Sequence, residues 1–212
     1  MALSRLALTV VLVLCPALAA PAAAQTAGGV FTVKTPGMVA TSPLPAFARS
    51  GGAEEYVNAG GGDRPWAIHE LIPKGESFEA WSTLFAGLLE ENLNQDMSAY
   101  VNTQFGVYAN ACGSTTDMFR LFRHDGTAQD NRERILFSIL CPAYNDSPDR
   151  GEVMVMMVVR QGRDYVRFYQ HWRGPAFDPD TPQGWPRPEP DALRDFLEIY
   201  DAARLTGQDG KG

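Results

Sequence analysis

Two strand-like segments joined by a tight turn constrain the fold of this chain more than any other feature. Residues 152–160 and 165–173 flank the short segment 161–164, which has the sequence Gln-Gly-Arg-Asp. Glycine in the first position of a two-residue loop is typical of a type II′ turn, which joins neighbouring antiparallel strands. We therefore predict a β-hairpin whose register pairs Glu152 with Arg173.

This register divides the side chains of the hairpin between two faces. One face is almost wholly apolar, and the other carries a line of aromatic and basic residues. Arginine and tyrosine side chains bind carboxylates and other anions, so the line predicts a binding site. The competing interpretation is a half-solvated sheet face on which long side chains shade apolar neighbours. The line consists of Tyr165, Arg167, Tyr169, His171 and Arg173.

The N-terminus has the three parts of a secretory signal peptide. Arg5 precedes the apolar run 6–14, and the small residues Ala22-Ala23-Ala24 precede Gln25. The apolar run is too short to cross about 30 Å of hydrocarbon. We predict that residues 1–24 are a signal peptide removed on export. The product is then periplasmic or secreted and has no membrane span.

Two cysteines remain once the signal peptide, with Cys15, is removed. An exported chain meets an oxidising compartment, so we predict a disulfide between Cys112 and Cys141. Closing a loop of this length stabilises the fold by ~3.6 kcal/mol in the chain-entropy model. The alternative is a pair of free, buried cysteines.

The charge balance bears on the class of partner. The formal net charge is −7 at pH 7, and removal of Arg5 makes the chain more acidic. Nucleic acids and anionic membranes need a basic surface, so neither is an expected partner. The sequence contains three histidines and no regular loop of oxygen ligands. We therefore expect no metal and no cofactor.

Composition divides the mature chain into three parts. The segment 25–64 is rich in Gly, Ala and Pro, and we predict that it is flexible, with short strands at 30–34 and 54–58. The segment 65–206 is predicted to form a single domain. The tail 207–212 is predicted to be disordered.

Periodicity within the predicted domain indicates both helices and strands. We predict strands over Trp66–Ile72 and Arg132–Tyr144, a helix from the cap Asp96 to Cys112, and a last helix from Asp191. A further helix is predicted after Ser77, because six apolar residues recur there at spacings of three and four. Those six are Phe78, Trp81, Leu84, Phe85, Leu88 and Leu89. The expected fold is an α+β domain with an antiparallel sheet of about five strands and two or three helices packed on one face.

One segment resembles a known pattern. The run Glu70-Leu-Ile-Pro-Lys-Gly-Glu-Ser-Phe-Glu-Ala-Trp81, with Cys112, Cys141 and the dipeptide Gly151-Glu152, resembles a family of exported bacterial proteins of unknown function. The resemblance covers about half of the mature chain. It implies an exported α+β domain and carries no activity.

Three function classes follow from these features. The first is a non-enzymatic binding protein that contacts a protein or a small anionic ligand through the aromatic and basic line. It is favoured because the sequence has no Gly-x-Ser-x-Gly motif for nucleophilic catalysis. The second is a hydrolase of envelope material with His171 as its base, which needs an acidic or hydroxyl group nearby. The candidates for that group are Glu152, Glu70 and Ser138. The third is an immunity-type partner of a secreted effector, suggested by the acidic charge.

Overall fold

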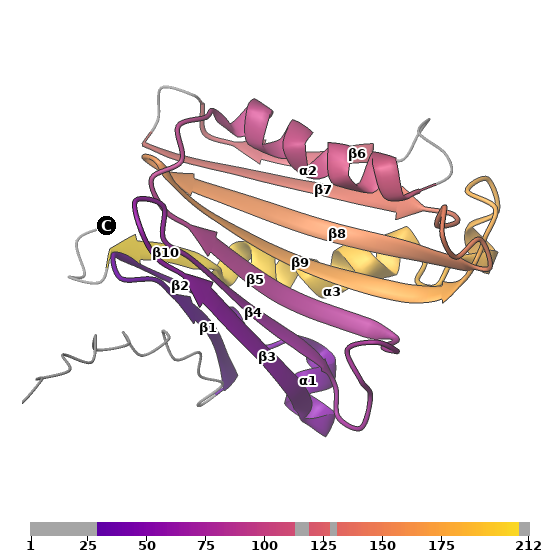
Figure 1. The fold of residues 1–212 in the computed structure, drawn as a ribbon. Helices are drawn as coiled ribbons and strands as arrows, with labels where there is room; N and C mark the ends of the chain where they lie inside the picture. Colours follow the sequence, from indigo (N-terminus) through magenta and orange to yellow (C-terminus); the bar gives the residue numbers. More distant parts are fainter. Residues whose placement is uncertain (1–28, 113–118, 128–130, 208–212) are drawn as a thin grey trace, which may run out of the picture.

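A computed structural model describes residues 29–112, 119–127 and 131–207. The predicted signal peptide, and residues 208–212 of the predicted tail, lie outside these residues. The described part of the chain forms ten strands in two antiparallel sheets (Figure 1). The larger sheet has seven strands in the order β3-β4-β5-β9-β8-β7-β6, and the smaller has three in the order β1-β2-β10.

The bounds of the elements follow the chain. The smaller sheet contains β1 (Val30–Lys34), β2 (Met38–Pro43) and β10 (Arg204–Gly207). The larger sheet contains β3 (Ala53–Gly60), β4 (Trp66–Pro73), β5 (Thr83–Glu90), β6 (Phe119–Asp125), β7 (Arg132–Cys141), β8 (Arg150–Gln161) and β9 (Asp164–Pro175). The helices are α1 (Ala46–Gly51), α2 (Met97–Ala111), the short 3₁₀ helix η2 (Pro182–Gly184) and α3 (Glu189–Ala202).

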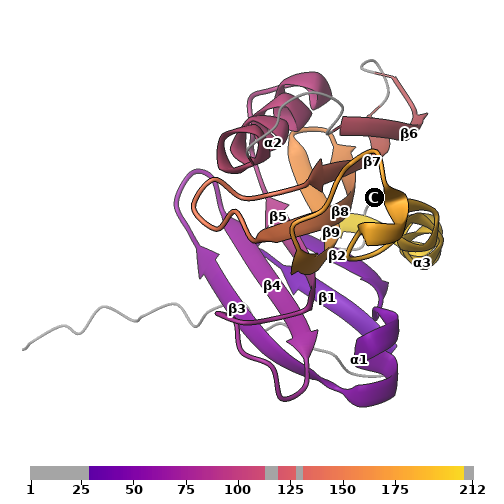
Figure 2. The same cartoon turned by 90° about the vertical axis from the view of Figure 1, so that its right-hand side faces the viewer.

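The predicted fold class is wrong in the balance of its elements. Strands dominate, and the sheet is wider than the expected five strands. Nor do the helices lie on one face. Helix α2 covers one face of the larger sheet, while α1, α3 and the smaller sheet cover the other (Figure 2). The physical reason is that the central strands β7 and β8 are apolar on both sides and need a covering layer on each.

The predicted helix after Ser77 is also wrong, because its second half is strand β5. Leu84, Ala86 and Leu88 pack toward α2, while Phe85 and Leu89 pack toward the smaller sheet. An apolar run buried on both faces satisfies a helical spacing by chance, so periodicity does not separate the two structures. Gly87 lies between Ala86 and Leu88.

The segment expected to be flexible contributes to the core. Between residues 30 and 60 the chain forms β1, β2, α1 and β3, and β1 has the bounds given to the first short strand. Phe31 and Ala40 from the smaller sheet are fully buried. Its alternating apolar residues pack against β4 and β5, which explains why a Gly- and Pro-rich segment is ordered.

The hairpin and the second helix agree with the sequence. Strands β8 and β9 pair in the predicted register, with Glu152 opposite Arg173 and Val153 opposite Trp172. Asp96 caps α2, because its side chain accepts a hydrogen bond from the Ala99 amide at 2.7 Å. The predicted disulfide joins Cys112 at the end of α2 to Cys141 at the end of β7.

Candidate functional site

The predicted line of aromatic and basic residues lies on the face of β9 that α2 covers. Two of its members take part in packing. Tyr165 is fully buried, stacks on Tyr100 of α2 and donates its hydroxyl to the Gln95 carbonyl at 2.8 Å. Arg167 is mostly buried and donates to Gln104 of α2. These two residues hold the helix against the sheet.

The other three members line a hollow of about 250 Å³ at the end of the sheet where α2 ends. We call this space the inner hollow. Its walls come from four strands, from α2 and from the segments that precede β5 and follow β7. The residues are Glu70, Trp81, Leu84, Tyr108, Tyr144, Glu152, Tyr169, His171 and Arg173. Residues from distant parts of the sequence therefore meet at one place.

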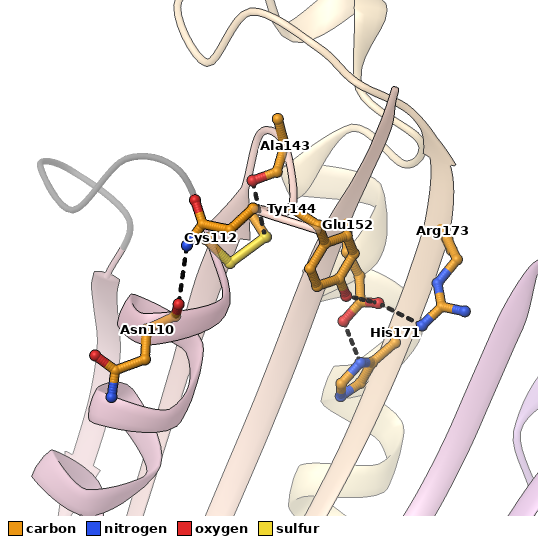
Figure 3. Close-up of a disulfide and its surroundings, with 9 residues drawn as sticks. Asn110, Cys112, Ala143, Tyr144, Glu152, His171 and Arg173 are labelled. Atoms are coloured by element: carbon orange, nitrogen blue, oxygen red, sulfur yellow. Dashed lines mark hydrogen bonds and ion pairs between the residues drawn. A yellow bond between two sulfur atoms is a disulfide. The ribbon is translucent and has the colours of Figure 1, made fainter. Parts of the chain in front are cut away.

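Glu152 organises one wall of the inner hollow. Its carboxylate accepts hydrogen bonds from the Nδ1 atom of His171 and from the Tyr144 hydroxyl, and Arg173 Nη2 lies 3.5 Å from it (Figure 3). The side chain is 2% exposed. A buried carboxylate is tolerated only when it is paired and hydrogen-bonded, and Glu152 meets both conditions.

Opposing influences act on the pKa of Glu152. Burial is the largest single influence and acts to raise it. The charge and hydrogen bond of His171, the Tyr144 hydroxyl and the Arg173 charge act together in the other direction, and they bring the pKa below its ordinary value. The group is therefore a carboxylate at neutral pH.

His171 is held by this carboxylate in a defined orientation. Because Nδ1 is bound to Glu152, the other ring nitrogen, Nε2, is directed away from this carboxylate, and the Tyr108 hydroxyl lies 3.4 Å from it. Burial raises the pKa of Tyr108 well above its ordinary value, so this hydroxyl keeps its proton. The pair of Glu152 and His171 has the geometry of an oriented base.

Glu70 is the second carboxyl group of the inner hollow. Burial raises its pKa, while His171 and the hydroxyl of Tyr169 act to lower it. Glu70 and Glu152 thus experience opposite net effects within one hollow. Such separation is common in functional sites, although structural ion pairs also produce it.

Arg173 stands at the junction of three hollows. Its guanidinium lies 3.7 Å from the centre of the Trp81 ring, a cation–π contact that fixes the side chain. Two larger hollows, of about 490 Å³ and about 520 Å³, adjoin the inner one, and Arg173 and Arg150 line both. We call these the outer hollows. Arg150 has no ion-pair partner within the described residues.

The three histidines do not gather into a metal site. His69 contacts Glu55, His124 contacts Glu133 and His171 contacts Glu152. Among the described residues, no group of three or more His, Cys, Asp or Glu side chains could hold a metal ion. Ser138, one of the candidate partners of His171, instead donates to Glu189 of α3 at 2.7 Å on the other face of the sheet.

Sequence reasoning missed the aromatic walls of the inner hollow. Trp81, Tyr108 and Tyr144 were assigned to helices or to a strand end, and no local signal brings them to His171. The signal that could have helped is the disulfide, because it places the end of α2 beside the end of β7, and so Tyr108 near Tyr144.

No family model matches the sequence, and no curated protein matches it. The resemblance to exported bacterial proteins therefore stays a prediction. The described residues include no helix with the length and apolar character that a membrane span requires.

Proposed function

We propose that this chain is an exported binding protein whose ligand is a small molecule with an anionic group, bound where the hollows meet at Arg173. The observation that carries the proposal is the pair of arginines at this junction. Arg150 starts β8 opposite Pro175, and Arg173 lies opposite Glu152 on β9. The two arginines are diagonal neighbours on adjacent strands, about 7–8 Å apart at their Cα atoms. A carboxylate or phosphate between them can accept hydrogen bonds from both guanidinium groups.

The surroundings of Arg173 support the same ligand class. Contact with Trp81 and with Glu152 holds its guanidinium in place before any ligand arrives, which lowers the entropy lost on binding. The inner hollow beside it offers aromatic faces, including those of Trp81 and Tyr144, for an uncharged part of the ligand. Export is supported by the signal-like N-terminus and by the disulfide.

The test uses Arg150, because its side chain has no ion-pair partner within the described residues. Arg150→Ala is expected to weaken binding of a simple probe such as benzoate at least tenfold, the loss of about one charged hydrogen bond. Arg194→Ala, an exposed arginine of α3, is the matched control and should leave the affinity unchanged. Binding is followed through the ring NMR signals of the three histidines. Benzoate that moves none of them at millimolar concentration, or that binds both variants alike, speaks against the proposal.

A second candidate function is hydrolysis with His171 as the base. The observation that favours it is the hydrogen bond from His171 Nδ1 to Glu152, because it directs Nε2 away from the carboxylate. The ligand retained by His171→Gln should then be the uncleaved form of the ligand retained by the wild-type protein. Identical ligand masses from the two proteins would exclude hydrolysis. No observation in the described structure favours an immunity-type function, and that function stays a prediction.

A further inference from the structure

The C-terminal end of α2 is fastened to the segment that follows β7. The disulfide between Cys112 and Cys141 is one link. The Asn145 amide donates to the Ala111 carbonyl at 2.9 Å, and the Asn145 side chain donates to the Asn110 carbonyl at 2.9 Å. Cys112 also forms a β-bridge with Tyr144. Figure 3 shows this junction beside the Glu152 cluster.

Both sides of the junction carry a wall of the inner hollow. On the helix side, the Cys112 amide donates to the Tyr108 carbonyl at 2.9 Å, and the Tyr108 hydroxyl reaches His171. On the strand side, Tyr144 lies three residues after Cys141 and donates its hydroxyl to Glu152. Cys141 is itself the cross-strand partner of Glu152. The disulfide is therefore directly beside Glu152, on the neighbouring strand.

The two halves of α2 are held by different means. The buried residues of the helix are Met97, Tyr100 and Val101, all in its first half. The second half contains Gly106, which lowers helix propensity, and the exposed Val107, and its core-facing residues Phe105, Tyr108 and Ala111 are only partly buried. Segments with few buried apolar contacts open locally at lower free energy than the rest of the protein. The covalent link at Cys112 compensates for this at the end that carries Tyr108.

We infer that the Cys112–Cys141 disulfide is a positioning element of the ligand site, which holds Tyr108 and Tyr144 over the Glu152–His171 pair. The inference rests on the proposed function for its consequence, namely that the reduced protein binds ligand more weakly. The positioning of Tyr108 and Tyr144 by the disulfide does not depend on any ligand. Opening the disulfide leaves the two sheets in place and releases the tyrosine walls of the inner hollow.

The experiment follows the histidine rings of the full chain by NMR before and after reduction with dithiothreitol. The reagent forms its cyclic disulfide as Cys112 and Cys141 become thiols. His171 signals are expected to move. His69, which lies on β4 and faces the smaller sheet, is the internal control and is expected to keep its signals. Removal of the reductant and reoxidation should restore the first spectrum.

Two variants keep the test decisive. Cys112→Ala with Cys141→Ala should reproduce the reduced spectrum without reagent. Tyr144→Phe, with the disulfide intact, removes only the hydroxyl on Glu152 and should move the His171 signals in the same direction, whereas Tyr56→Phe on the exposed edge strand β3 should not. Unchanged His171 signals after reduction would overturn the inference. Loss of the native signals of His69 together with those of His171 would also overturn it, because the disulfide would then hold the whole fold.

The ligand readout separates this inference from the proposed function. If benzoate binds the oxidised protein, its affinity is expected to fall about tenfold on reduction. If benzoate does not bind the oxidised protein, the proposed function fails, and the movement of His171 relative to His69 still decides the role of the disulfide. Equal benzoate affinity in the oxidised and reduced proteins contradicts the inference.

Discussion

The two faces of the seven-stranded sheet are covered in different ways. Toward the smaller sheet and α3, β9 presents Val166, Phe168 and Trp172 to an apolar core. Toward α2, the same strand presents arginine, histidine and tyrosine side chains that are paired with groups from other elements. The apolar face is stabilised by the close packing of its side chains, and the polar face is stabilised by the pairing of its charged groups. Among the described residues, the polar face of β9 contributes Tyr169, His171 and Arg173 to the inner hollow, whereas the other face of this strand, from Val166 to Trp172, is apolar except for the buried Gln170.

The largest expected effect tests the apolar face. Phe168→Ala should lower the free energy of unfolding by about 3–5 kcal/mol, because it removes a fully buried ring that packs against Phe31 and Phe85. Urea denaturation measures the change. Tyr169→Phe, the next residue on the opposite face, keeps its ring and is the control, with a smaller expected loss. Equal losses would remove the contrast between the faces.

The next effect tests charge pairing on the polar face. Glu152→Gln should lower the free energy of unfolding by about 3 kcal/mol at pH 7, because it leaves His171 and Arg173 without their buried counter-ion. Glu198→Gln, which breaks an exposed pair with Arg49, is the matched control and should cost less than about 1 kcal/mol.

The same variant has a defined pH dependence. The pKa of Glu152 in the folded protein is below its ordinary value of about 4.3, so the unfolded chain binds more protons in the interval between the two pKa values. The stability from this carboxylate is present above the ordinary pKa and is lost as pH falls toward the folded pKa. The difference between wild type and Glu152→Gln should therefore shrink below about pH 4. A difference that stays constant down to pH 3 would contradict the assignment.

A smaller effect tests how closely the two sheets approach. A Cβ atom on Gly87 would lie 2.8 Å from a ring carbon of Phe31 and 3.2 Å from one of Phe168. Gly87→Ala should therefore cost about 1–3 kcal/mol by overpacking. Gly106→Ala in α2 meets no atom within 4 Å and should instead stabilise the protein by roughly 0.5–1 kcal/mol. Thermal unfolding of the two variants compares them, and stabilisation by Gly87→Ala would mean that the sheets are looser than described.

The smallest effect concerns Glu70. Burial raises its pKa in the folded state, so the folded protein binds more protons than the unfolded chain between the two pKa values. Stability is therefore lost as pH rises through that interval. Glu70→Gln should be slightly more stable than wild type at pH 7 and equal to it below about pH 4. Parallel denaturation curves at both pH values check this, and a variant that is less stable at pH 7 would show that the carboxylate is needed in its charged form.

The sequence predicts local features of this fold better than its layers. The β8–β9 register was predictable because the turn and the two-faced pattern agree, and a slip by one residue would exchange the faces. Strand β5 was not predictable, because a strand that is buried on both faces shows no alternation of apolar and polar residues. Gly87 was the available signal, since glycine inside an apolar strand often marks the close approach of another segment. The smaller sheet joins β2 to β10 across most of the chain, a pairing that local patterns do not encode.

The same limit applies to the site. His171, Arg173 and Tyr169 were predicted to share a face because they alternate on one strand, and the structure places them in one hollow. Glu152 was a named candidate partner of His171, and the two side chains are hydrogen-bonded. That α2 would bury Tyr165 and Arg167 could not be predicted, because it depends on which face the helix covers.

The most direct test of the ligand site is native mass spectrometry of the full chain secreted into a bacterial periplasm, with Arg150→Ala and Arg194→Ala measured beside the wild type. We predict that wild type and Arg194→Ala carry the same additional small mass and that Arg150→Ala lacks it. An additional mass retained equally by all three proteins, or absent from all three, would contradict a ligand site at the junction of Arg150 and Arg173.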